Sequence, residues 1–134
     1  MNIKDPIIMS KLENYFNLTP NKKPSKSNPI VFRRNKLLRG INKQISNINN
    51  LKNGMRVTNC WWWNDENNNF YLIIKYGKTE LELSKNKYSI QFKNIDEVLD
   101  GLNKIKSLTQ SGHFDMKLSD ISKSIRNNFQ SSSS

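Results

Sequence analysis

The chain has 134 residues and carries 22 Lys and Arg against 11 Asp and Glu, which gives a formal net charge of +11. This length fits one domain rather than two, and a single cysteine excludes an internal disulfide. No apolar run reaches the roughly 20 residues of a membrane span, and the N-terminal patch 7–9 is too short for a signal peptide. We therefore expect a cytoplasmic protein with no membrane partner.

The positive charge is concentrated in the first half of the chain. Residues 1–59 hold 12 Lys and Arg but only two acids, Asp5 and Glu13, whereas residues 60–134 hold 10 Lys and Arg and 9 Asp and Glu. Such asymmetry indicates a polyanionic partner: nucleic acid first, then an acidic membrane or an acidic protein.

Three regions are expected from composition. Residues 1–29 form a weakly ordered basic arm, because prolines interrupt a stretch of Asn, Lys and Ser that offers nothing to bury. Four of its side chains could instead form a short docking segment: Leu12, Tyr15, Phe16 and Leu18. Residues 30–129 form a single α+β domain, and the serine-rich 130–134 form a disordered tail.

The first regular element is an amphipathic helix over 30–50. Its apolar positions repeat every three to four residues and gather on one side, at Leu37, Leu38, Ile41, Ile45 and Ile48. Cations gather on the opposite side, at Arg33, Lys36, Arg39 and Lys43, beside Arg34. A charged helix face is often merely solvated, but such a face normally mixes signs. This one has no acid between Glu13 and Asp65, which favours a phosphate-binding role.

The period then changes from 3.6 to 2, which predicts strands. We expect a four-stranded antiparallel meander over 56–63, 70–76, 79–84 and 88–92, with polar loops and a Gly77-Lys78 turn between the strands. Two helices follow, over 95–108 and 115–129. Asn94 and Glu97 form a capping-box-like start for the first, and Gly112 is its C-terminal stop. We expect the two C-terminal helices to pack on one face of the sheet.

No residues combine into a catalytic or metal site. His113 is the only histidine, Cys60 has no histidine nearby, and the acidic pairs lie at a loop and at a helix start. There is no phosphate-binding glycine loop and no zinc motif. We therefore expect a protein that is not an enzyme and takes no cofactor.

The Trp61-Trp62-Trp63 run is the most unusual feature of the sequence. On a strand, Trp61 and Trp63 point to one face and Trp62 to the other. The run could pack under a helix and cover a sheet end or a dimer contact. It could also be a platform for stacking unpaired bases, with Tyr76 as a further aromatic. Phosphate contacts would then come from three flanking cations: Arg56, Lys75 and Lys78.

Several motifs in order resemble an uncharacterised family of small basic proteins from proteobacteria and their phages. They are the helix start Arg33–Leu37, the Trp run, the Tyr76-Gly77-Lys78 turn, the Ile95-Asp96-Glu97 helix start and the closing 126–129. The resemblance covers about 28–129 and implies a bacterial or phage origin but no activity. In layout alone, 56–110 is similar to PC4-like and whirly single-stranded-DNA-binding proteins, which bind as dimers or larger assemblies.

The sequence thus predicts a protein that binds nucleic acid, with single strands favoured over duplex because aromatics suit unstacked bases. It also leaves room for a homodimer. The alternative is a protein-interaction module, such as a phage or host accessory factor or a virion component, that docks its Trp-rich face on an acidic partner. Geometry discriminates between them. A basic helix face and a Trp face on one side favour nucleic acid, and opposite sides favour a protein partner.

Overall fold

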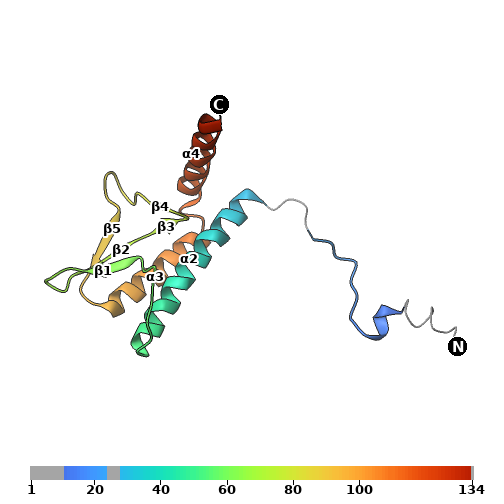
Figure 1. Ribbon diagram of the computed structural model, residues 1–134, viewed down its shortest axis with the longest axis horizontal. Helices are drawn as coiled ribbons and strands as arrows, with labels where there is room; N and C mark the ends of the chain where they lie inside the picture. The colour runs from blue at the N-terminus through green and yellow to red at the C-terminus, as the bar shows by residue number, and fades with distance from the viewer. Residues whose placement is uncertain (1–10, 24–27, 134) are drawn as a thin grey trace.

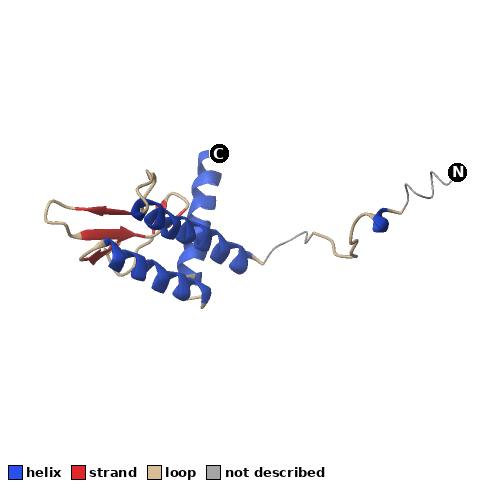
Figure 2. Ribbon diagram, turned by 90° about the horizontal axis from the view of Figure 1, so that it is seen from below, coloured by secondary structure: helices blue, strands red, loops and turns tan. Residues whose placement is uncertain are grey.

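A computed structural model describes residues 11–23 and 28–133 of the chain, with side chains up to Asn127. The elements in chain order are η1 (Leu12–Asn14), α2 (Pro29–Lys52), β1 (Trp62–Asn64), β2 (Phe70–Ile73), β3 (Lys75–Tyr76), β4 (Thr79–Glu80), β5 (Ser89–Phe92), α3 (Ile95–Gln110) and α4 (Asp115–Ser133). Figures 1 and 2 show helices α2 and α3 running side by side next to a small sheet, with the last helix, α4, projecting away from the sheet.

The helix predicted over 30–50 is confirmed as α2. Its start is fixed by Asn28, whose side-chain oxygen accepts a hydrogen bond from the Ile30 backbone N–H at 2.9 Å, and by Pro29 in the first turn. The apolar face is buried at Leu37, Ile41 and Ile48, mainly against α3. The cations Lys36, Arg39 and Lys43 are exposed, as the helix period predicts.

The α+β class is confirmed, but the four-stranded meander is wrong. The strands form a three-stranded antiparallel sheet in the order β1-β2-β5 and a separate two-stranded ribbon of β3 and β4. The first predicted strand, 56–63, is strand only from Trp62 onward, because Asn59 takes a left-handed backbone conformation with φ +57° and bends the chain.

The remaining differences come from a change of strand partner at Ile74. Leu72, Ile74 and Tyr76 are all buried, as the period of 2 over 70–76 predicts. However, β2 pairs with β1 and β5, whereas β3 folds back on β4 across the Gly77-Lys78 turn. Alternation specifies which face is buried but not which strand lies alongside.

Helix α3 covers the inner face of the sheet. Asn94 caps it by accepting from the Glu97 N–H, while Glu97 accepts from the Lys93 N–H, so the predicted cap is present with the return bond displaced by one residue. Gly101 faces Phe92 of β5 so closely that a Cβ on Gly101 would lie 2.4 Å from the ring. A glycine is therefore required for this helix–sheet contact.

The packing predicted for the last helix is wrong. Helix α4 packs mainly against α2, with Lys117 and Asp120 close to Glu80 of β4, and Figure 1 shows it beside the N-terminal half of α2. Arg34 of α2 donates two hydrogen bonds to Asp115 at the start of α4, at 2.9 and 2.5 Å. Gly112, with φ +91°, ends α3 and turns the chain into α4.

The predicted N-terminal arm and C-terminal tail lie at the two ends of the chain, outside the core. In the arm, residues 1–10 and 24–27 lie outside the described residues, and every residue of 11–23 is exposed. The backbone of α4 continues to Ser133, into the predicted tail. Within the described residues, no helix has the length and hydropathy to cross a membrane.

Candidate nucleic-acid interface

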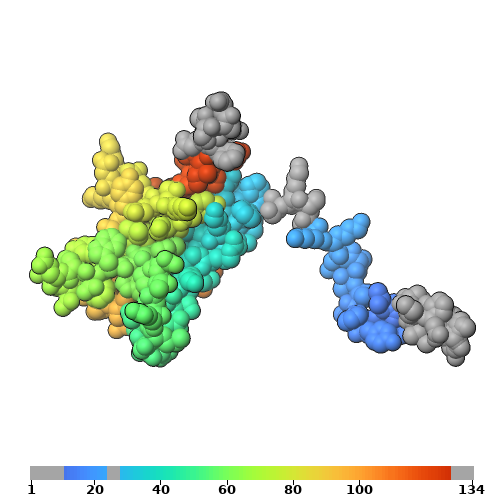
Figure 3. Space-filling view, in the orientation of Figure 1, coloured from blue at the N-terminus to red at the C-terminus, as the bar shows by residue number. Residues whose placement is uncertain are grey.

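A groove of about 470 Å³ runs between α2 and the strands. Three cations line it: Arg39 and Lys43 from α2 and Lys75 from β3. We call it the basic groove, and its other lining residues are Gly40, Gln44, Asn59, Cys60, Trp61, Ile73 and Gly77. No carboxylate is among them. Figure 3 shows α2 (cyan) bordering the green and yellow-green surface of the segments that supply the other wall.

Two buried side-chain amides of α2 hold the segment 58–61, of which residues 59–61 form part of the groove wall opposite the helix. Gln44 donates to the Asn59 carbonyl at 3.1 Å and accepts from the Trp61 N–H at 2.9 Å. Asn47 donates to the Thr58 carbonyl at 3.2 Å. Sequence reasoning missed both residues. A signal was present, because Gln44 is three residues after Ile41 and four before Ile48, on the apolar face of the helix.

The three tryptophans occupy three different environments. Trp61 is 9% exposed and its ring packs over Gly40, where a Cβ would lie 2.9 Å from it. Trp62 is 8% exposed and pairs with Leu72 in the core. Trp63 is 47% exposed. Trp62 therefore has no free ring face for a base, and only Trp63 is a candidate platform.

Trp63 lies on the outer face of the sheet, stacked on Tyr71 with ring centroids 5.5 Å apart and planes 24° from parallel. The Tyr71 hydroxyl donates to Asp65 at 3.0 Å. Asp65 also accepts from the backbone N–H groups of Asn67 and Asn69. These bonds, led by the one from Asn69, lower the pKa of Asp65, and the bond to Asp65 raises the pKa of Tyr71. The hairpin loop thus holds Tyr71 in place beneath Trp63.

The Trp63 platform and the basic groove are on the same side of the molecule. Strand register pairs Trp63 with Tyr71, and the Ile73 N–H donates to the Trp61 carbonyl at 3.0 Å. Tyr71 and Ile73 are two residues apart on β2, so their side chains share one face about 7 Å apart. Since Ile73 lines the basic groove, the stacked pair lies directly beside it.

The predicted Tyr76 is in the core, with 4% of its surface exposed. Its ring lies under Lys36, whose ammonium nitrogen is 4.7 Å from the ring centroid. This cation–π contact positions Lys36 above the turn at Gly77. Tyr76 therefore orients a cation rather than offering a stacking surface in the basic groove.

The other predicted cations separate into three groups. Arg34 is paired with Asp115, which raises the pKa of Arg34 and lowers that of Asp115, so its guanidinium is committed to the fold. Arg33 lines a different cavity, described below. Arg56 and Lys78 are exposed but do not line the basic groove. The structure thus joins Arg39, Lys43, Lys75 and Trp61 out of the predicted set.

Cys60 places a thiol, a potential nucleophile, among the residues that line the basic groove. It is partly buried, and desolvation raises the pKa of its thiol. A thiol with a raised pKa is a poor nucleophile at neutral pH. Among the residues that the structure describes, no three His, Cys, Asp or Glu side chains lie close enough to hold a metal ion.

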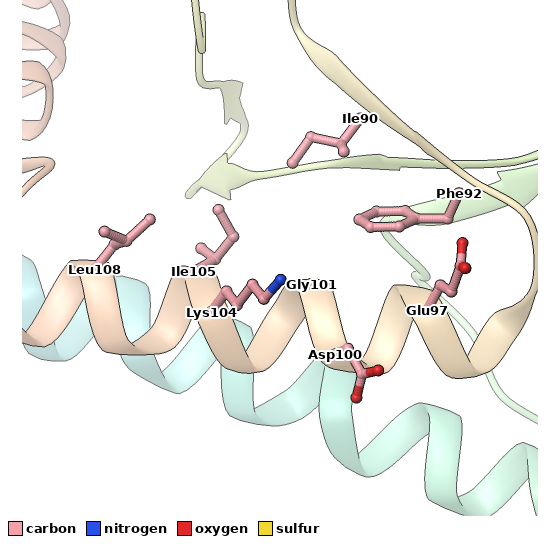
Figure 4. Close-up of a pocket in the computed structure, with 8 residues that line it drawn as sticks. All are labelled: Ile90, Phe92, Glu97, Asp100, Gly101, Lys104, Ile105 and Leu108. Atoms are coloured by element: carbon pink, nitrogen blue, oxygen red, sulfur yellow. The ribbon is translucent and has the colours of Figure 1, made fainter.

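A second groove, of about 490 Å³, lies between β5 and α3 (Figure 4). Its floor is formed by Ile90, Phe92, Ile105 and Leu108, with Gly101 between them. We call it the apolar groove. The charged residues on its rim are Glu97, Asp100 and Lys104, which sum to a negative charge and do not suit a phosphate.

Comparisons with protein-family models, curated proteins and solved structures each gave no match to this chain.

Proposed function

We propose that this protein is a non-enzymatic binder of single-stranded DNA or RNA, with its site in the basic groove and on the adjoining Trp63 platform. One observation carries the proposal: Arg39, Lys43 and Lys75 line a groove without carboxylates, immediately beside an exposed, preorganised aromatic pair.

The electrostatics of the basic groove suit a phosphate backbone. In the described part of the chain, the ion pairs are Arg34–Asp115 and Lys52–Asp96. The groove cations are in neither, so their charge is available to a ligand. Each phosphate that they neutralise releases condensed counterions, so binding should weaken steeply as salt is added.

The aromatic pair suits an unpaired base. One face of the Trp63 indole is covered by Tyr71, and the side chain is still 47% exposed. A base stacked on such a ring contributes about 1–3 kcal/mol irrespective of its identity. In duplex nucleic acid the base faces are occupied by their neighbours, so this geometry favours single strands.

The arrangement also bears on the alternative of a protein-interaction module. An acidic protein docking on the Trp face would be favoured if that face and the basic helix face were on opposite sides. Instead, Trp61, Ile73, Arg39 and Lys43 line the same groove. The proximity of cations and aromatics supports the hypothesis of nucleic-acid binding. A protein partner would be indicated if the oligonucleotide titration below shows no binding.

The test is titration of the purified protein into a labelled oligo-dT, followed by fluorescence anisotropy at two salt concentrations and by tryptophan emission. We expect salt-sensitive binding with quenching, because Trp63 is the exposed indole beside the groove. Salt-sensitive binding without quenching would remove the platform from the site. Absence of binding at low salt would contradict the proposal, and a pull-down with acidic proteins would then be the next experiment.

A further inference from the structure

A second basic cavity, of about 340 Å³, lies where the N-terminal half of α2 meets α4, as Figure 1 shows for these two helices. We call it the arginine pocket. Its lining comes from three elements: Pro29, Phe32 and Arg33 of α2, Tyr76 of β3, and Ser122 and Arg126 of α4. A cavity of this volume is within the range of small-ligand sites.

The chemistry of the arginine pocket suits a phosphate. Two arginines, Arg33 of α2 and Arg126 of α4, line this one cavity from different helices. Guanidinium presents a planar fork of donors that matches phosphate oxygens. No carboxylate is among the lining residues. The charge of Arg33 acts on Asp115, but the pKa of Asp115 is lowered most by the hydrogen bond from Arg34 and least by the charge of Arg33. Asp115 is thus committed mainly to Arg34.

The pocket also offers a surface for a base. Phe32 lines it and is 52% exposed. Ser122 of α4 lines it as well. An exposed phenyl ring next to two arginines is the combination that binds a nucleotide unit by stacking and by charge together.

Lys36 connects the arginine pocket to the basic groove. Its ammonium nitrogen lies over the Tyr76 ring, which lines the arginine pocket, and 3.7 Å from the Cβ position of Gly77, which lines the basic groove. Cations therefore follow one another along α2 from Arg33 to Lys43. The ten helical steps from Arg33 to Lys43 span about 15 Å, the length of about four to five phosphates of a stacked strand.

We propose that the arginine pocket is a second subsite for the same single strand, in which Arg33 and Arg126 bind a phosphate and Phe32 stacks a base. This inference rests on the proposed function, since it extends the strand path beyond the basic groove. It adds three residues that the sequence did not single out for binding: Phe32, Ser122 and Arg126.

The experiment compares R126Q with K123Q in salt titrations of oligo-dT binding. Both variants remove one positive charge from the exposed surface of α4, but Lys123 does not line the pocket. Loss of one phosphate contact lowers the slope of log K against log salt by about 0.7 for a single strand. We expect this fall in R126Q and in R33Q, with no fall in K123Q. Tryptophan quenching at saturation should be unchanged, because no tryptophan lines the pocket.

The outcomes separate this inference from the proposed function. Wild-type binding with a wild-type slope in R126Q overturns the subsite and leaves the basic groove intact. An equal fall in R126Q and K123Q overturns it as well, because it shows a general charge effect. Absence of wild-type binding at low salt overturns both proposals.

Discussion

The basic groove and the apolar groove have nearly the same volume, about 470 and 490 Å³, and nearly opposite linings. The first combines three cations with polar and aromatic side chains, and the second combines an apolar floor with two acids and one lysine. The comparison shows that concavity alone does not identify a site in a protein with a net charge of +11. The basic groove is our proposed site because its cations lie next to an exposed aromatic pair.

The largest effect is expected from removing the charge of the basic groove. The triple variant R39Q/K43Q/K75Q should lower the slope of log K against log salt by about 2, because three phosphate contacts are lost. Anisotropy titrations with oligo-dT measure it. The matched control is K85Q/K87Q/K104Q, in which three exposed lysines outside the basic groove are changed. Equal slopes in the two triple variants would show that total charge, and not the groove, governs binding.

The next effect is expected at the platform. Trp63→Ala should weaken oligonucleotide binding by about 1–3 kcal/mol, the contribution of one stacked base. Trp63→Phe should retain most of the affinity, because a ring is kept. Since Trp63 is half exposed, the urea midpoint should move little in either variant. Undiminished affinity of Trp63→Ala would place the bases elsewhere on the protein.

A change beside the apolar groove should affect stability and spare binding. In Gly101→Ala the new Cβ would lie 2.4 Å from the Phe92 ring, and overpacking of this kind costs about 1–3 kcal/mol. Urea unfolding measures the loss, with Ser107→Ala on the exposed side of α3 as the control. If the folded Gly101→Ala protein no longer binds oligo-dT, the apolar groove is part of the binding site and the two grooves are not independent.

The smallest effect concerns pH. The pKa of Asp115 is lowered in the folded protein, chiefly by the hydrogen bond from Arg34. The stabilisation from this pair is therefore complete above the unfolded pKa of about 3.9 and is lost as pH falls through the lower, folded value. We expect Asp115→Asn to lose stability at neutral pH and to show a smaller acid-induced decline than the wild type in urea unfolding. Parallel acid-induced declines in both proteins would contradict this role.

Helix positions and the basic face could be predicted from the sequence because they depend on local periodicity. The contact partner of each cation could not be predicted from the sequence. Arg34 is committed to Asp115, which is 81 residues away in the chain, and Lys36 to Tyr76 across a turn of the β3–β4 ribbon. Likewise, the burial of Ile74 follows from alternation. Its carbonyl accepts a hydrogen bond from the Leu81 N–H beside the β3–β4 ribbon, and this bond depends on a choice between strand partners that no short pattern encodes.

The burial of Trp61 could not be predicted either, because it depends on contacts with a helix that lies earlier in the chain. The Trp run predicted two faces, but burial of Trp61 depends on Gly40 and on the Gln44 amide that holds its backbone. Glycine at 40 reads in the sequence as a weak point of the helix, costing about 1 kcal/mol relative to alanine. In the structure it is the position that admits an indole ring.

Cys60 allows a direct test of whether a single strand occupies the basic groove. It is the only cysteine of the chain and lines this groove, so its alkylation rate reports on one site. The rate should be measured at a fixed alkaline pH, with and without saturating oligo-dT, and with the urea-unfolded protein as the upper limit. We predict marked slowing by the oligonucleotide. An unchanged rate, with anisotropy showing the oligonucleotide bound, would show that the strand binds outside the basic groove.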